Sequence, residues 1–149
     1  MKEPPDHHDA ELLLRLYDLR REEKLRLARE WFTREFSAAS LEEVRKKYPS
    51  GTQENSYYRM VTSYWEMTAS FVNHGLIKEE FFFENTGEIW VVWEKVKPLV
   101  AGVREAYKNP YMWKNLETLN AKFEKWMAGR APEALDALRA MIASAQVKK

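Results

Sequence analysis

The sequence has no cysteine, few residues that form turns and no long apolar run. Without cysteine the chain can hold neither a disulfide framework nor a thiolate zinc site, and it has no cysteine nucleophile. Five glycines and six prolines in 149 residues are too few for the many tight turns of a β-sandwich. No stretch approaches the ~18 apolar residues of a membrane span, and the first residues lack the apolar centre of an export signal. We therefore expect a soluble, cytoplasmic protein without a membrane span.

The chain also lacks an excess of charge of either sign. It has 24 basic and 23 acidic side chains, which give a net charge of +1, so no strong field attracts nucleic acid. Arg45, Lys46 and Lys47 stand beside Tyr48, but most basic residues of the N-terminal segment have acidic neighbours. We therefore expect no nucleic-acid partner.

Apolar residues recur at helical spacing along most of the chain. The pattern predicts an all-α, single-domain bundle of about five to six helices over residues 1–149, with residues 1–8 frayed and residues 147–149 as a tail. The predicted helices run from Asp9 to about Phe36, from Ser40 to Tyr48, from about Gln53 to Asn73, from Gly87 to about Lys108, from Pro110 to Gly129, and from Pro132 onward. A short connecting helix is also expected within Leu76 to Asn85.

Local signals set several of these boundaries. Ser40 and Glu43 have the spacing of a capping box, and Asn109 precedes Pro110 as a helix N-cap. Gly75 is suited to the left-handed position that ends the central helix. Pro98 removes one backbone donor inside the helix that begins at Gly87, so we expect a kink there.

The N-terminal helix is predicted to be the longest, and it carries apolar residues on more than one face. Its main apolar stripe consists of Leu14, Tyr17, Leu25, Ala28, Phe32 and Phe36. Four leucines lie off this stripe, and we expect them to form the interface of a homodimer: Leu12, Leu13, Leu16 and Leu19. The outer face predicts three ion pairs with a glutamate four residues before an arginine: Glu11–Arg15, Glu22–Arg26 and Glu30–Arg34. Arg21 falls on the stripe, and its guanidinium either extends to solvent or pairs with a carboxylate of another helix.

The sequence lacks the common catalytic and cofactor motifs. Phosphate-binding glycine loops, the nucleophile elbow and the zinc helix are absent, and no histidine has the spacing of a di-iron bundle. His7, His8 and Asp9 are adjacent and cannot easily converge on one metal ion. His74 is either a helix-end cap or a general base with Glu66, which we place on the polar face of the central helix; capping is the preferred interpretation. We expect no cofactor, no metal site and no catalytic residue.

Aromatic residues are abundant, and some of them flank cations. Six Trp, seven Tyr and seven Phe are present, and we expect most of them in the core. On the helix predicted from Gly87, Trp93, Lys97 and Arg104 follow one line, with Trp90 beside it. Aromatic walls and cations together suit a small anionic or aromatic ligand, whereas buried stems with solvated head groups would explain the pattern without a ligand.

A set of packing and capping residues lies between about Trp65 and Phe123. It comprises Gly75-Leu76-Ile77, Trp93-Glu94, Pro98, Arg104 and Leu116-Glu117-x-Leu119. On these residues the chain resembles a bacterial domain-of-unknown-function family of helical proteins, some of which carry an N-terminal membrane helix. The resemblance implies an all-α fold, and it implies no activity, ligand or catalytic residue. This chain differs from the membrane-tethered members because its first helix is charged and amphipathic.

Two functions are open from the sequence. The missing catalytic motifs and the surplus of aromatic residues favour a non-enzymatic module that acts by contact with a partner protein or with a second copy of itself. The alternative is a small-ligand or enzymatic site lined by Trp90, Trp93, Lys97 and Arg104. A deep pocket with Arg104 at its wall would favour the ligand site, and a filled interior with a flat aromatic patch would favour the interaction module.

Overall fold

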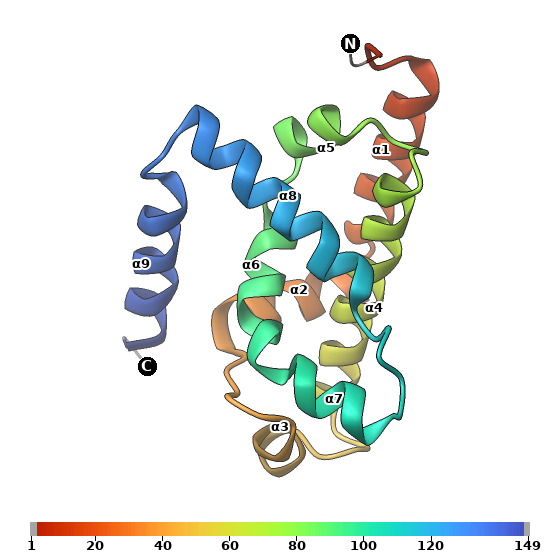
Figure 1. Ribbon diagram of the computed structural model, residues 1–149. Coiled ribbons are helices and arrows are strands. Elements are labelled where there is room, and N and C mark those ends of the chain that lie inside the picture. The colour runs from red at the N-terminus through yellow and green to blue at the C-terminus, as the bar shows by residue number, and fades with distance from the viewer. Residues whose placement is uncertain (1–2, 148–149) are drawn as a thin grey trace.

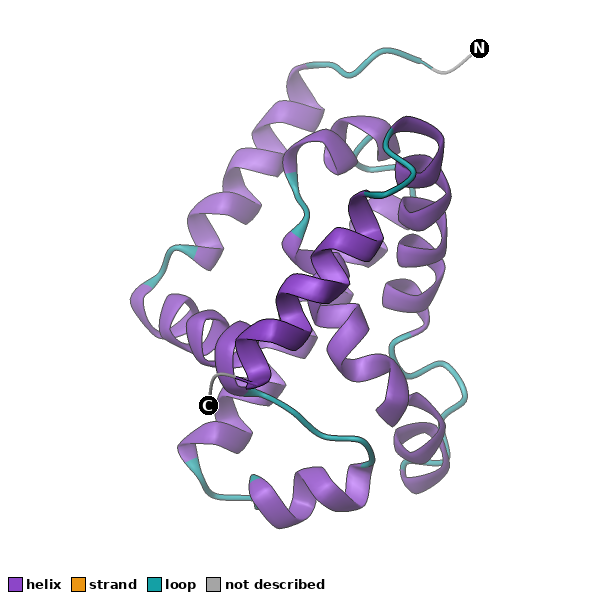
Figure 2. Cartoon of the chain, turned by 90° about the vertical axis from the view of Figure 1, so that its left-hand side faces the viewer, coloured by secondary structure: helices purple, strands orange, loops and turns teal. Residues whose placement is uncertain are grey.

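The computed structural model describes residues 3–147, and all the regular secondary structure in them is helical (Figure 2). The elements are α1 (His7–Arg20), α2 (Glu23–Glu35), α3 (Leu41–Lys47), α4 (Gln53–Asn73), α5 (Glu79–Asn85), α6 (Glu88–Val96), a 3-10 turn (Lys97–Leu99), α7 (Val100–Ala106), α8 (Lys114–Arg130) and α9 (Ala134–Val147). The all-α prediction is confirmed for this part of the chain. The predicted number of five to six helices is too low, because two predicted long helices are divided.

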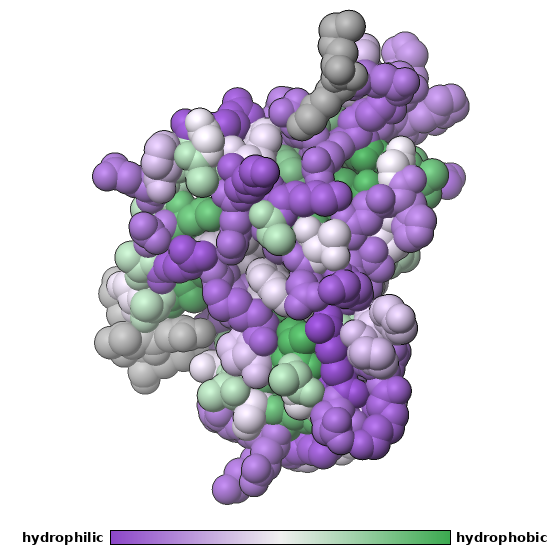
Figure 3. All heavy atoms as spheres, viewed as in Figure 1, coloured by the Kyte–Doolittle hydropathy of each residue, from purple (hydrophilic) through white to green (hydrophobic). Residues whose placement is uncertain are grey.

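Helix α4 lies at the centre of the bundle. It packs against α2 and α8, and it buries Val61 and Trp65. Helices α1 and α5 lie at one end of the molecule and α3 and α7 at the other, while α9 stands beside α6 and α8 (Figure 1). Phe32 of α2 and Trp90 of α6 are also fully buried, so one core joins the central helices. Polar side chains cover most of the face seen in Figure 3, with small apolar patches between them.

The prediction of one helix from Asp9 to Phe36 is wrong, because the chain turns between α1 and α2. Glu22 leaves the helical conformation (φ −54°, ψ 139°). Its carboxylate accepts hydrogen bonds from the backbone N–H groups of Lys24 (3.2 Å) and Leu25 (3.1 Å). This side-chain cap satisfies two of the free N–H groups at the start of α2, so a new helix begins there without glycine or proline.

The break also changes which side of α1 faces the core. Leu14 is 62% exposed and Tyr17 is 44% exposed, so their predicted place on the core stripe is wrong. Leu16 is 2% exposed instead, and its carbonyl accepts a hydrogen bond from the hydroxyl of Tyr64 (2.5 Å). In α2 the stripe is as predicted, since its aromatic member Phe32 is fully buried. A turn between two amphipathic helices resets their rotational register, which a continuous helix would have preserved.

The helix predicted from Gly87 to Lys108 is divided around Pro98. Helix α6 ends at Val96, the 3-10 turn follows, and α7 begins at Val100. Proline has no N–H for an α-helical hydrogen bond, so the 3-10 turn interrupts the helix at the position where only a kink was predicted. Helix α7 leaves α6 in a different direction (Figure 1).

The helix predicted from Pro110 begins later, at Lys114, so this boundary is wrong. Asn109 accepts the backbone N–H of Tyr111 at its side-chain oxygen (2.9 Å) and makes a turn. Trp113 then adopts a left-handed backbone conformation (φ 56°) immediately before α8. The side chain of Trp113 provides no cap for the helix that follows.

The missing cap of α8 comes from α4. The carboxylate of Glu66 accepts hydrogen bonds from the N–H groups of Asn115 (3.3 Å) and Leu116 (2.9 Å) and from the side-chain amide of Asn115 (2.9 Å). Glu66 is half-buried against α8, so its predicted place on a polar face away from the core is wrong. The negative charge of Glu66 at this position also interacts favourably with the partial positive charge at the N-terminus of α8.

The central boundaries follow the sequence signals. Ser40 accepts the N–H of Glu43 (3.1 Å) at the start of α3, α4 ends at Asn73, and Gly75 has the expected positive φ of 80°. His74 contacts the carbonyl of Ser70 (2.8 Å) at the end of α4, in agreement with a capping role.

The N-terminus is ordered further than predicted. Asp6 and Asp9 cap each other's backbone N–H groups (3.1 and 2.8 Å), so His7 and His8 begin α1 and are not frayed. Asp9 is buried and also accepts the backbone N–H of Lys78 (2.7 Å), which attaches α1 to the start of α5. Val147 was predicted to belong to the C-terminal tail, but it is the last residue of α9. The predictions for residues 1–2 and 148–149 lie outside the described residues.

Candidate functional site

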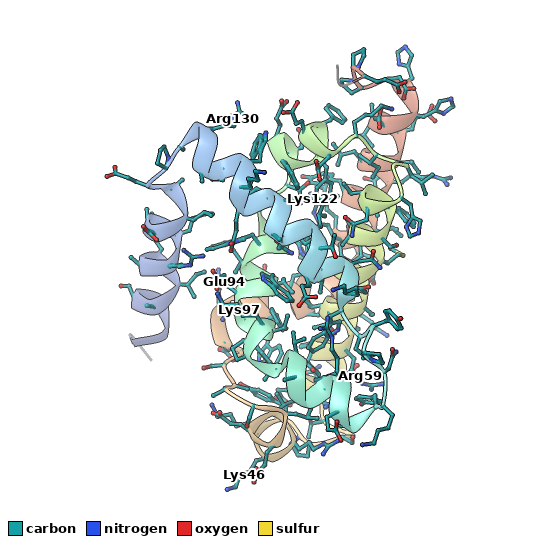
Figure 4. The ribbon with its side chains drawn as sticks, in the orientation of Figure 1. Lys46, Arg59, Glu94, Lys97, Lys122 and Arg130 are labelled. Carbon is teal, nitrogen blue, oxygen red and sulfur yellow. The ribbon has the colours of Figure 1, made fainter. Side chains whose placement is uncertain are left out.

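The four residues proposed from the sequence as a ligand site have different partners. Trp90 is fully buried and donates its indole N–H to Glu124 (3.0 Å), and Trp93 is half-buried against the core. Lys97 pairs with Glu94, which lies one turn before it on α6 (Figure 4). Arg104 lies on α7, beyond the 3-10 turn, and its hydrogen-bond and ion-pair partners are in the loop before α8 and on α8 itself.

Arg104 holds the loop that precedes α8. Its guanidinium donates to the carbonyl of Met112 (2.9 Å) and pairs with Glu117 (3.3 Å). The hydrogen bond from Lys114 is the main cause that lowers the pKa of Glu117; burial opposes it, and Arg104 adds to the lowering. Arg104 is therefore engaged with its own chain.

The four leucines proposed as an interface are not all at the surface. Leu16 is buried, and Leu12 and Leu13 are half-buried against the core. Leu19 is 54% exposed. The largest exposed apolar side chains elsewhere on α1 are those of Leu14 and Tyr17.

A cleft of about 260 Å³ lies at the turn between α1 and α2. We call it the arginine cleft, and it is lined by Tyr17, Arg20, Arg21, Arg26, Arg29, Glu30, Thr33 and Glu88. Four guanidinium groups and two carboxylates share this cleft. Because like charges repel, such a concentration of arginines is unfavourable without compensating groups.

Arg29 has its compensation inside the protein. It donates to both oxygens of Glu88 at the start of α6 (2.7 and 3.0 Å) and to the carbonyl of Arg20 at the end of α1 (2.8 Å). Burial would lower the pKa of Arg29, but the contact with Glu88 outweighs it and the pKa is raised. This bidentate pair joins α1, α2 and α6, so it forms a fixed wall of the cleft.

The other three arginines have no ion-pair partner among the residues that the structure describes. The predicted pair of Arg26 with Glu22 does not form, because Glu22 caps α2 instead. The N–H groups of Lys24 and Leu25 accordingly lower the pKa of Glu22. The predicted pairs Glu11–Arg15 and Glu30–Arg34 are also not formed within the described residues.

Arg20 and Arg21 rest on aromatic rings. The guanidinium carbon of Arg20 lies 4.9 Å from the ring centre of Tyr17 and 5.6 Å from that of Trp65. The guanidinium carbon of Arg21 lies 5.4 Å from the ring centre of Tyr17, so Arg21 stacks on its own helix. Stacking fixes the plane of a guanidinium and leaves its in-plane N–H groups available to a carboxylate or phosphate.

The cleft therefore has the chemistry of an anion-binding site. Arg20, Arg21 and Arg26 offer N–H donors, and Tyr17 offers an aromatic surface. No group of three or more metal-ligating side chains occurs in the described part of the chain. The Arg20-Arg21 doublet is visible in the sequence. Arg26 was not recognised as part of the same cleft, because one continuous helix would place it in an ion pair with Glu22.

Comparisons with known proteins give one match. Neither a curated protein nor a solved structure matches the chain. Within the described residues, no helix has the length and apolar character needed to cross a membrane. A family model matches residues 5–126, a wider range than the Trp65 to Phe123 segment on which the resemblance was based. The resemblance is confirmed, and the chain belongs to the family described as Domain of unknown function (DUF4760).

Proposed function

We propose that the protein is a non-enzymatic interaction module that binds an acidic segment of a partner protein in the arginine cleft. One observation carries this proposal: Arg20, Arg21 and Arg26 line one cleft, and none of them has an ion-pair partner in the described residues. Recognition of carboxylate or phosphate groups by clustered arginines is a recurring mode of peptide binding. The bidentate pair of Arg29 and Glu88 keeps the cleft in place without using these three groups.

An exposed apolar strip next to the cleft supports a peptide as the ligand. Leu14 and Tyr17 are three residues apart on α1, so they lie on neighbouring positions of one helix face. Tyr17 belongs to both the strip and the cleft. A segment with acidic side chains beside an apolar one would contact both features, whereas a free inorganic anion would use only the cleft.

Fluorescence anisotropy with a labelled peptide of glutamate and leucine tests the proposal. We expect saturable binding that weakens as salt is added, because exposed ion pairs are screened. The variant Arg20→Gln/Arg21→Gln/Arg26→Gln should weaken binding by about tenfold or more. Leu14→Ala should weaken binding of this peptide but not of a peptide that contains glutamate without leucine.

A control variant removes the same charge elsewhere. Arg45→Gln/Lys46→Gln/Lys125→Gln changes three exposed cations outside the cleft, and it should bind the peptide as the wild type does. Equal losses in the two triple variants would mean that net charge alone attracts the peptide, and the proposal would be rejected. A phosphoserine peptide in the same assay distinguishes phosphate from carboxylate recognition.

A further inference from the structure

A cavity of about 250 Å³ lies where α9 packs against α6 and against the segment that follows α2. We call it the α9 cavity. Its apolar lining comes from Ala38 after α2, from Pro98 of the 3-10 turn, and from Ile142 and Ala143 of α9. Figure 1 shows α9 beside α6, so segments that are distant in the sequence border this space together. The apolar lining favours a ligand with an apolar body.

The charged part of the lining contains two cations and one carboxylate. These are Lys95 and Glu94 of α6 and Arg139 of α9. The carboxylate of Glu94 already binds two cations, because Arg139 donates to one of its oxygens (2.7 Å) and Lys97 contacts the other. Lys95 is only 7% exposed, and its ammonium donates to the carbonyl of Phe36 (2.8 Å). A buried cation beside apolar groups favours an anionic ligand, since attraction between charges is stronger away from water.

Arg139 holds the α9 wall of the cavity in place. One of its terminal nitrogens pairs with Glu124 of α8 (3.3 Å), and its guanidinium carbon lies 5.3 Å from the ring centre of Trp90. The hydrogen bond with Glu94 is the main cause that raises the pKa of Arg139. The guanidinium thus attaches α9 to α6 and α8, and we assign recognition of the anion to the buried ammonium of Lys95.

The volume of the cavity sets the size of the ligand. An apolar cavity of about 150 Å³ is enough to hold benzene, so about 250 Å³ accommodates one ring with a short acidic substituent. Drug-sized ligands occupy pockets of about 300 Å³ or more. We propose that the α9 cavity binds a small aromatic monocarboxylate, with the carboxylate at Lys95 and the ring against Pro98 and Ile142. This site is separate from the arginine cleft, which lies at the turn between α1 and α2.

Titration of the full-length protein with sodium phenylacetate, followed by NMR, tests the charge recognition. We expect saturable binding with a dissociation constant below about 1 mM, and binding of the neutral analogue phenylacetamide should be about tenfold weaker. Lys95→Met should weaken binding of phenylacetate by about tenfold or more and leave binding of phenylacetamide unchanged. Lys46→Met is the matched control, because Lys46 is an exposed lysine of α3 outside the cavity. Equal effects of Lys95→Met on the two probes would overturn the assignment of the carboxylate to Lys95.

A second variant fills the cavity without changing a charge. Ala143→Leu places a larger side chain in the cavity and keeps a good helix former in α9, so binding of phenylacetate should fall by about tenfold or more. Ala145→Leu is the matched control, because Ala145 is exposed and lies on the opposite side of the helix. The variant Arg20→Gln/Arg21→Gln/Arg26→Gln should bind phenylacetate as the wild type does, and a loss of binding there would place the carboxylate in the arginine cleft instead. Absence of saturable binding to the wild type, or equal binding to Ala143→Leu, would overturn the proposal.

Discussion

The cap that Glu66 provides for α8 allows the most direct test of the packing. Glu66 stands on α4, and its carboxylate accepts three hydrogen bonds from residues 115 and 116. Leu116 is fully buried, so no solvent can replace the carboxylate at its N–H group. Replacement of Glu66 by alanine should therefore destabilise the contact between α4 and α8, on which the core depends.

The magnitude follows from the groups that lose their partner. A hydrogen bond to a charged group contributes about 1.5–3 kcal/mol, and loss of a helix N-cap costs about 0.5–2 kcal/mol. These contributions overlap because they describe the same carboxylate, so we expect Glu66→Ala to reduce the free energy of unfolding by about 3 kcal/mol. Glu66→Gln keeps one acceptor oxygen, and it should cost about 1 kcal/mol.

Urea denaturation followed by circular dichroism measures both variants. Glu11→Ala is a matched control, because Glu11 is an exposed glutamate in a helix, and it should change the free energy of unfolding by less than about 0.5 kcal/mol. Hydrogen exchange at the amide of Leu116 should accelerate in Glu66→Ala. A loss no larger than that of the Glu11 control would show that Glu66 does not cap α8.

Two further predictions concern the N-terminus and the tryptophans of α6. Burial alone would raise the pKa of Asp9, but the N–H groups of Asp6 and Lys78 outweigh burial and lower it below its ordinary value of 3.8. The ionised Asp9 therefore stabilises the fold above about pH 3.8, and this stabilisation is lost as the pH falls through the pKa of the folded state. Thermal melting should show that Asp9→Asn is less stable than the wild type at pH 7. The variant should also lose less stability than the wild type on acidification below about pH 4. Trp93→Ala should reduce the free energy of unfolding by about 3 kcal/mol, and Trp90→Ala should reduce it more, because Trp93 is half-buried and Trp90 is fully buried. Urea denaturation that shows an equal or smaller loss for Trp90→Ala would contradict this burial.

Much of the fold could be predicted because its signals are local. The cap at Ser40, the glycine at position 75 and the apolar stripe of α4 each depend on residues close in the sequence. The short helix α5 also lies within the segment from Leu76 to Asn85 in which a helix was predicted. Periodicity and capping act within a few residues, so one sequence is enough to recognise them.

The errors lie where a distant residue decides the local structure. Helix α8 starts at Lys114 with its cap supplied by Glu66, which precedes it by about fifty residues. Leu16 is buried partly because α4 lies over it, and Tyr64 bonds to its carbonyl. Leu14 and Leu16 have the same hydrophobicity, and only the tertiary position of α1 distinguishes them.

The arginine cleft could not be predicted for a related reason. Within one continuous helix, Glu22 lies four residues before Arg26 and would neutralise it. The turn redirects that carboxylate to backbone N–H groups, which also brings the end of α1 toward Arg29. Because Glu22 caps α2 and does not pair with Arg26, it both begins a new helix and leaves Arg26 without an ion-pair partner among the described residues. Glu22→Ala should weaken the start of α2 and leave Arg20, Arg21 and Arg26 in place, so it should lower the free energy of unfolding by more than it changes the free energy of binding an acidic peptide.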